Sequence, residues 1–445
     1  MSIVIMVGQL ILGLSILVIL HELGHFLAAR AFGIKVDKFY LFFDAWGFSL
    51  FKFNYKGVEY GIGWLPLGGY VKIAGMIDES MDTEQLAGPP QPWEFRSKPA
   101  WQRLIVMLGG VFVNIVLGIF IFWVLTIKYG ETYMPNDALK YGIVPGKLGM
   151  KIGLQPGDNI TAINGKKVLY FEELTGTKVI LGNTDLTVLR KGQTLHVRVP
   201  GTLINDLGDV NATIEDFISR APRFKFVVDS VSPKMGARKA GLVKGDSILA
   251  INAAKITYFD QLQAQLQQYK SKQVQLTVKH GDSIEHKIAT IDKDGVLGFF
   301  PKDDLPKMER LTYGFFGSLP VGATKAWGTF TDNAKGIGKM ITGEVKLNKA
   351  VRGPVAIATM FGTHIDWIRF WSLVGFLSMV LALTNLLPIP ALDGGHAVFL
   401  VIEMIKGKPL SDKFLERAQI VGFVLLITLM VFVFGNDIMR QVMKK

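Results

Sequence analysis

His21-Glu22-Leu23-Gly24-His25 directly follows Ile3–Leu20, a run without a charged residue that predicts a lipid-embedded helix. A helix places residues i and i+4 on one face, so His21 and His25 can offer two imidazole nitrogens to one metal ion. Glu22 can then act as general base on a water molecule that the metal activates. Ionisable groups are costly inside a membrane, so this position favours a functional site over a chance match on a soluble helix.

Composition predicts a membrane protein with a large water-exposed part. Hydrophobic residues make up 49% of the chain and the mean hydropathy is +0.32, while 19% of the residues are charged. The first apolar run lacks a basic leader and a small-residue cleavage site, so we expect it to be retained as a helix. Four uncharged runs are long enough to cross a bilayer: Ile3–Leu20, Leu104–Ile127, Trp371–Leu392 and Ala418–Gly435.

Charge and cysteine content exclude several classes of function. The formal net charge is +12, but Lys and Arg are scattered without a dense basic tract or a recognisable nucleic-acid module. We therefore expect a basic surface that contacts anionic membrane lipid, and no nucleic-acid partner. The chain has no cysteine, which excludes thiolate ligands, disulfides and cysteine nucleophiles.

The segment between the first two spans, residues 31–103, is predicted to form a membrane-associated β-loop with a surface helix. Lys35–Phe53 and Val58–Ile73 alternate aromatic and β-branched residues in the manner of strands. Gly57 favours one turn, and Pro66-Leu67-Gly68-Gly69-Tyr70 a second. Composition assigns two further pieces, a mobile acidic loop over Met76–Pro92 and a membrane-surface segment over Trp93–Arg103.

An internal repeat lies between the second and third spans. The pattern Gly-Leu-x-x-Gly-Asp-x-Ile-x-x-Ile-Asn begins at Gly153 and again 88 residues later at Gly241. Two copies at a domain-sized period predict two homologous modules. The pattern is typical of PDZ domains, which bind extended peptides by adding a strand to a sheet edge. The alternative is that one or both modules only occupy space above the membrane, because the sequence places no carboxylate-binding loop.

A metal held by two histidines needs a third protein ligand. No third histidine follows at the metzincin spacing, and the better candidate is Asp393, at the end of an uncharged span. Asp393 could instead simply end the helix, which Pro388 and Pro390 already interrupt. Counting the spans puts His21, His25 and Asp393 at the same membrane depth, which favours the ligand.

These motifs together resemble the site-2 protease family of intramembrane zinc metalloproteases, and most closely its bacterial RseP (regulator of sigma-E protease) branch. The likeness covers nearly the whole chain, including Pro66–Lys72 and Arg352-Gly353-Pro354. One departure is Leu108–Asn114, which lacks the proline of the family's Ala-Gly-Pro-x-x-Asn. The resemblance implies one Zn²⁺ per chain. Its implied site consists of the ligands His21, His25 and Asp393 and the general base Glu22.

The resemblance also implies a multi-pass protein of the bacterial inner membrane. Its active site would lie near the cytoplasmic face and its PDZ pair in the periplasm. Relatives cleave the spanning helix of single-span proteins, such as pre-trimmed anti-sigma factors and remnant signal peptides, in regulated intramembrane proteolysis. Independently, Lys and Arg in Arg30–Arg103 and Lys406–Arg417 favour the cytoplasmic side for these segments.

Substrate binding is predicted around the same site. A peptide bond inside a helix is inaccessible, so a substrate must unwind, and the edge of Val58–Ile73 could pair with it. Asn385 carries an amide that could hold the substrate backbone, unless it only caps a broken helix while the loop plugs the site. The residues assigned to substrate binding are Asn385, Pro388, Pro390, Gly68, Gly69 and Tyr70.

The predicted fold is thus a polytopic α-helical membrane protein with four transmembrane helices, a β-loop and two PDZ-like α/β domains. Two other functions compete with the protease: a catalytically inactive membrane-anchored PDZ binding module, and a metal transporter. The predicted segments are helix one with the zinc motif (1–30), the β-loop and surface helix (31–103), helix two (104–128), PDZ-like domain one (129–220), PDZ-like domain two (221–305), a periplasmic linker with an amphipathic segment (306–369), helix three with the aspartate ligand (370–393), a cytoplasmic turn (394–417) and helix four (418–438).

Overall fold

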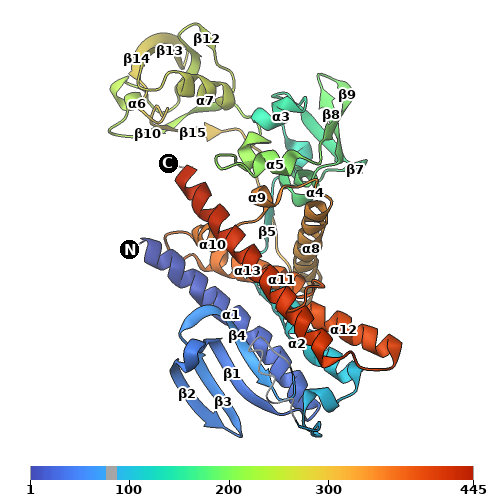
Figure 1. The fold of residues 1–445 in the computed structure, drawn as a ribbon. Helices are drawn as coiled ribbons and strands as arrows, with labels where there is room; N and C mark the ends of the chain where they lie inside the picture. The colour runs from blue at the N-terminus through green and yellow to red at the C-terminus, as the bar shows by residue number, and fades with distance from the viewer. Residues whose placement is uncertain (1, 77–87, 444–445) are drawn as a thin grey trace. The chain divides into compact units, whose positions relative to one another are not determined.

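The computed structural model describes residues 2–76 and 88–443, which divide into two compact units. The helical unit consists of Met1–Glu131 and Thr312–Lys445, and the β unit of Thr132–Leu311 (Figure 1). Most of the loop predicted over Met76–Pro92 lies outside the described residues.

Long apolar helices dominate the helical unit. Within the described part of the chain, four helices are long and apolar enough to cross a membrane, which supports the predicted polytopic architecture. Three of them, α1, α2 and α11, pack against one another (Figure 1). The second begins before the predicted Leu104, so the membrane-surface segment contributes only a short 3₁₀ turn, Phe95–Ser97, and the first turn of the helix. The four helices are α1 (Ser2–Ala31), α2 (Ala100–Tyr129), α11 (Trp367–Asn385) and α13 (Asp412–Met443).

The third predicted span is shorter than the sequence indicated. Helix α11 ends at Asn385, and the chain then turns without regular structure until Asp393. Pro388 and Pro390 explain the break, because neither can donate a backbone hydrogen bond to a continuing helix. Asp393 is therefore the first residue of a new helix and not the last residue of the span.

The turn predicted over residues 394–417 is also wrong, because most of this segment is helical. Residues Asp393–Lys406 form helix α12, and only a short connection separates it from α13. Gly407 ends α12 in a left-handed conformation (φ 68°), and its N–H donates to the Glu403 carbonyl. The turn is therefore confined to the short connection between α12 and α13.

A four-stranded sheet follows α1 in the order β2-β3-β1-β4, in which β1 and β3 run parallel and the other pairs antiparallel. The turn predicted over Pro66–Tyr70 is wrong, because these residues lie within β4. Since β4 is an edge strand, the missing N–H of Pro66 is tolerated there. The strands are β1 (Val36–Phe43), β2 (Ser49–Tyr55), β3 (Val58–Gly63) and β4 (Leu65–Ile73), with a 3₁₀ turn at Ala45–Gly47.

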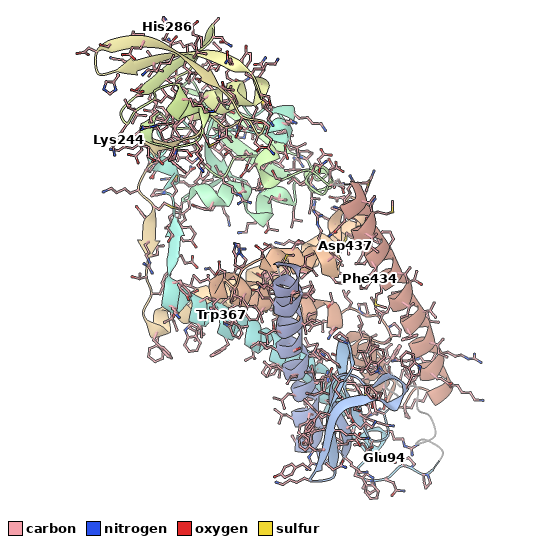
Figure 2. The ribbon with its side chains drawn as sticks, turned by 90° about the vertical axis from the view of Figure 1, so that its left-hand side faces the viewer. Glu94, Lys244, His286, Trp367, Phe434 and Asp437 are labelled. Carbon is pink, nitrogen blue, oxygen red and sulfur yellow. The ribbon has the colours of Figure 1, made fainter. Side chains whose placement is uncertain are left out.

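The predicted linker and amphipathic segment contains three helices: α8 (Phe315–Ile341), α9 (Leu347–Ala350) and α10 (Pro354–Phe361). Asp437, labelled on α13 in Figure 2, caps α10 from a distance. Its Oδ2 accepts hydrogen bonds from the backbone N–H groups of Val355 (2.9 Å) and Ala356 (3.0 Å). This carboxylate therefore satisfies two of the donors that a helix N-terminus leaves free.

Two similar sheets form the β unit, as the internal repeat predicts. Their strand orders are β7-β6-β8-β9 and β12-β11-β13-β14. The register shifts at the equivalent place in both sheets. In the first, the shift lies on β6 between Ile160 and Ala162, and in the second it lies on β11 between Ile248 and Ala250. Lys244 and His286, labelled in Figure 2, belong to the second module. A separate apolar core fills each module.

The modules differ in their helices, since only the second contains a helix of more than two turns, α7 (Phe259–Gln268), within the described residues. The strands of the first module are β6 (Asn159–Ile163), β7 (Lys166–Lys167), β8 (Thr184–Arg190) and β9 (Gln193–Val199), with helices α3 (Lys147–Lys151), α4 (Thr177–Ile180) and α5 (Leu203–Leu207). Those of the second are β10 (Phe226–Val231), β11 (Ser247–Ile251), β12 (Ala254–Lys255), β13 (Gln273–His280), β14 (Ser283–Thr290) and β15 (Phe299–Asp303), with helix α6 (Gly236–Lys239). The short strands β5 (Glu131–Tyr133) and β16 (Glu309–Leu311) lie at the ends of the unit.

Candidate metal centre

The structure brings together the three residues that the sequence selected as metal ligands. His21 and His25 lie one turn apart on α1, and Asp393 begins α12. The two Nε2 atoms are 3.2 Å apart, and Asp393 Oδ2 lies 3.2 Å from Nε2 of His21 and 3.4 Å from Nε2 of His25. Both imidazoles are buried. Three atoms from two distant parts of the chain therefore converge on one point.

This spacing fits a tetrahedral zinc ion. Bonds of about 2.0–2.1 Å at the tetrahedral angle separate two ligand atoms by about 3.3–3.4 Å. The three measured separations, 3.2, 3.2 and 3.4 Å, are close to that value. In addition, Asp393 Oδ2 is buried and accepts no hydrogen bond of good geometry from the described residues. A buried carboxylate oxygen without a donor is costly, and a cation between the two histidines would satisfy it.

Helix α2 orients the second histidine. The Nδ1–H of His25 donates to the Val106 carbonyl at 2.8 Å, because a carbonyl can only accept. The lone pair of His25 therefore lies on Nε2, the atom that faces His21 and Asp393. Metal-binding histidines commonly have such a partner on the second ring nitrogen, which fixes the tautomer and the ring orientation.

Glycines let α2 approach the histidines this closely. A Cβ on Gly24 of α1 would lie 2.3 Å from the carbonyl oxygen of Gly109, and a Cβ on Gly110 would lie 2.4 Å from His25 Nε2. Any larger residue would force the two helices apart, as in other packed membrane helices with small residues at the interface. The Gly109-Gly110 pair lies within the stretch Leu108–Asn114, whose named departure from the family pattern is the missing proline, and the close helix contact gives the two glycines a structural reason.

A cavity of about 1010 Å³ opens beside the three converging atoms. Glu22 lines it, with the backbone N–H of Val71 on β4 next to its carboxylate. The predicted substrate residues Gly68, Gly69, Tyr70 and Asn385 line the same cavity, whereas Pro388 and Pro390 are not among the described residues that do. The prolines shape the connection between α11 and α12 instead.

Asn385 lies closest to the converging atoms among the predicted substrate residues. Its Nδ2 is 3.1 Å from His21 Nε2. Gly69 is needed where β4 crosses α1, because a Cβ there would lie 2.7 Å from both the Tyr40 carbonyl oxygen and a methyl carbon of Val18. The strand backbone can therefore reach the edge of the cavity only with glycine at this position.

Tyr70 belongs to a polar network at the cavity wall. Its hydroxyl donates to Asp44 Oδ1 at 2.7 Å, and Lys38 donates to Asp44 Oδ2 at 3.1 Å. Burial, together with the neighbouring Asp44 carboxylate, raises the pKa of the Tyr70 hydroxyl well above its ordinary value of 10. Tyr70 is therefore a neutral donor at physiological pH and fixes the position of Asp44.

Sequence reasoning missed several residues that the structure places around the centre. Asn114 of α2 contacts His21, and His396 and Gln419 line the cavity. A signal for two of them was present. Asn114 is the one amide in the second uncharged run, and His396 follows Asp393 at a spacing that puts both on one helix face. Nothing in the sequence links Gln419 to the site.

Comparison with known proteins agrees with this geometry. A family model for Peptidase family M50 matches residues 9–429. The chain is 30% identical to the regulator of sigma E protease of Haemophilus influenzae, over 99% of this chain and 100% of that protein. It is 29% identical to the regulator of sigma-E protease RseP of Escherichia coli, over 97% and 98% of the two chains. A protein of Vibrio cholerae assigned as a zinc metalloprotease is 27% identical over 97% of each chain. With a family match over nearly its whole length and a centre whose donors fit zinc, the chain belongs to peptidase family M50, the site-2 protease family, and is a zinc metalloprotease.

Proposed function

We propose that this protein hydrolyses peptide bonds within the transmembrane helices of single-span proteins. In this proposal His21, His25 and Asp393 hold one Zn²⁺, and Glu22 is the general base. The observation that carries it is the convergence of the three ligand atoms at 3.2–3.4 Å, with both histidines and Glu22 on a helix apolar enough to cross a membrane. A centre on a membrane-spanning helix is accessible to substrates within the membrane and not to soluble proteins.

The chemistry follows from the groups around the cavity. A zinc ion held there supplies a Lewis acid, which polarises the scissile carbonyl and activates a water molecule. Glu22 takes a proton from the attacking water and returns it to the leaving amide nitrogen. Asn385, whose amide N–H faces the ligand atoms, donates to the substrate carbonyl as negative charge develops on it.

The substrate must be extended before it can be cleaved. Unwinding a helix in lipid frees backbone groups, each of which costs several kcal/mol when left without a partner. Strand β4 lies along the cavity and is an edge strand, whose neighbour in the described sheet is β1, so its outer side can pair with an extended segment. Substrates with helix-breaking residues near the cut should therefore be cleaved faster than Leu-rich ones of equal length.

The relatives' names support a place for this activity in the cell. The two relatives named regulator of sigma-E protease, from Haemophilus influenzae and Escherichia coli, match this chain over nearly their whole length. We therefore infer a bacterial inner-membrane protein that cleaves an anti-sigma factor after another protease has trimmed it. The active site lies near the cytoplasmic face in this proposal, and the two PDZ-like modules lie in the periplasm.

The second PDZ-like module has a groove in which a peptide would fit. The groove, of about 380 Å³, runs between α7 and the segment Gly295–Phe299. We propose that it binds periplasmic peptide segments and that the pair of modules excludes substrates that still carry a bulky periplasmic domain. Deleting residues from about Pro135 to Phe300 should then permit cleavage of untrimmed substrate. Unchanged discrimination after the deletion would point to scaffolding instead.

The proposed activity is tested with purified protein and a detergent-solubilised single-span substrate. Cleavage should require zinc and stop with a chelator. Glu22→Gln should keep zinc and lose cleavage, whereas Asp393→Asn should lose both or bind zinc only weakly. His364→Ala is the matched control, because this exposed histidine hydrogen-bonds only to the neighbouring Thr363 among the described residues.

The same assay separates the competing functions. Normal cleavage by Glu22→Gln would refute the general-base assignment. Zinc binding without cleavage of any single-span substrate by the unaltered protein would favour the inactive PDZ binding module. Metal uptake into vesicles without cleavage would favour a transporter.

A further inference from the structure

We infer that Asn114 sets the tautomer of His21, so that this histidine presents its Nε2 lone pair to zinc before the metal arrives. This inference rests on the proposed zinc site and adds a positioning residue to it. Asn114 lies on α2, fully buried, with its side-chain amide 3.0 Å from His21 Nδ1. The structure provides His21 with no backbone carbonyl partner comparable to the one Val106 gives His25 among the described hydrogen bonds.

The contacts of the two His21 ring nitrogens are incompatible as they stand. Amide nitrogens face both ring nitrogens, Asn114 Nδ2 at Nδ1 and Asn385 Nδ2 at Nε2 (3.1 Å). A neutral imidazole has one N–H and one lone pair, so it can accept from only one of these two donors. One of the two amides must therefore be turned by half a rotation, which exchanges its oxygen and nitrogen. The two orientations have the same shape, so hydrogen bonding decides between them.

Asn114 is the amide to turn, because Nε2 is the His21 atom that meets the other two ligand atoms and must keep its lone pair for the metal. Its Oδ1 is buried and accepts no hydrogen bond from the described residues. Turning the amide places this oxygen against His21 Nδ1, where it accepts the ring N–H, and breaks no hydrogen bond on its other side. Asn385 then keeps its donor at Nε2, the atom that faces His25 and Asp393.

The two histidines then reach the same state by different means. His25 donates its Nδ1–H to the Val106 carbonyl, and His21 donates its Nδ1–H to the Asn114 amide oxygen. Both acceptors lie on α2, two turns apart, so one helix prepares both ligands. The Ser378 hydroxyl of α11 donates to the Asn114 backbone carbonyl at 2.7 Å, a contact in which the side-chain amide of Asn114 takes no part.

The test measures zinc affinity by competition with a chromophoric chelator, in the full-length protein. Asn114→Leu keeps the branching at Cγ but removes the acceptor, and we expect roughly 10–100-fold weaker zinc binding, the usual effect of losing such a partner. Asn114→Asp keeps an acceptor and should stay within about threefold of the unaltered protein. Ser378→Ala, which removes a contact to the Asn114 backbone only, should also leave affinity within that range.

A second measurement reads the tautomer directly and needs no enzyme activity. In metal-free protein with ¹⁵N-labelled histidine, the His21 ring should carry its proton on Nδ1, and Asn114→Leu should shift the proton toward Nε2. A His21 proton on Nε2 in the unaltered metal-free protein would overturn the inference, as would equal zinc affinity of Asn114→Leu and the unaltered protein. If the unaltered protein binds no zinc at all, the proposed metal site fails instead, and the tautomer measurement still tests Asn114.

Discussion

Gly110→Ala should weaken zinc binding severely, although alanine is the better helix former. Its added Cβ would lie 2.4 Å from His25 Nε2 and 2.7 Å from His21 Nδ1. Ordinary contact begins at 3.4 Å, so the His25 ring would have to move by about 1.0 Å. Metal sites tolerate changes of only about 0.2 Å in ligand distance. The alternative, a retreat of α2, would break the His25–Val106 hydrogen bond.

The magnitude follows from these opposing terms. Replacing glycine inside a helix favours the folded chain by about 0.5–1 kcal/mol, and overpacking costs about 1–3 kcal/mol. We therefore expect a small loss of stability but a fall in zinc affinity of more than about 100-fold, beyond the effect of losing an outer partner. Gly118→Ala on the same helix is the control, because its Cβ meets the flexible Met379 side chain.

Chelator competition measures the affinity of both variants, and thermal unfolding of the metal-free protein measures their stability. The reasoning is refuted if Gly110→Ala binds zinc as tightly as Gly118→Ala. A loss of zinc that is matched by global unfolding would show that the clash acts on the fold and not on the ligands.

Three further predictions concern other parts of the helical unit. Asn385→Ala should lower the cleavage rate by on the order of 10²-fold with near-normal zinc content, as expected for a lost donor to a developing oxyanion; an unchanged rate in a gel-based cleavage assay would contradict it. Asp437→Asn should lower the free energy of unfolding by about 1–3 kcal/mol, because one carboxylate oxygen caps two N–H groups; an unchanged melting curve would argue against the cap. Tyr40→Phe should raise the pKa of Glu59, which the Tyr40 hydroxyl, more than any other neighbour, holds below its ordinary value. A lowered pKa of Glu59 stabilises the folded state at pH values above its pKa in the unfolded chain, about 4.3, and this stabilisation is lost as the pH falls. The variant should therefore lose less stability than the unaltered protein when the pH is lowered below about 4.3. NMR titration measures the shift in the pKa of Glu59.

The meeting of His21, His25 and Asp393 was predictable because their chemistry conflicts with the apolar sequence around them. Carboxylate and imidazole side chains are costly at the ends of membrane-spanning runs, so each of His21, His25 and Asp393 could be identified from the sequence as a candidate functional residue. Helix periodicity then linked the two histidines, and span counting linked Asp393 to them. The repeat was equally visible, since its glycines and buried apolar residues keep their spacing in both modules.

Tertiary packing determined what the sequence did not reveal. Hydropathy is continuous from Trp371 to Leu392, so it could not show that the helix ends at Asn385 and restarts at Asp393. The turn expected at Pro66–Tyr70 is a strand because β1 pairs with it and α1 accepts its glycine backbone. The sequence named Asn114 only as part of a family motif and not as a partner of His21, because an amide in an apolar helix gains meaning only from the ring beside it.

The position of Asp393 late in the chain has a consequence for biosynthesis. The histidines emerge from the ribosome among the first residues made, but the carboxylate that joins them is synthesised near the end. Two histidines alone are an incomplete catalytic zinc site, since such sites use three protein ligands. If the centre is built as proposed, a nascent chain inserted only as far as α2 and α8 carries Glu22 and the two histidines without the third ligand. In that case the order of residues along the chain delays a complete centre until the last part of the protein has been made.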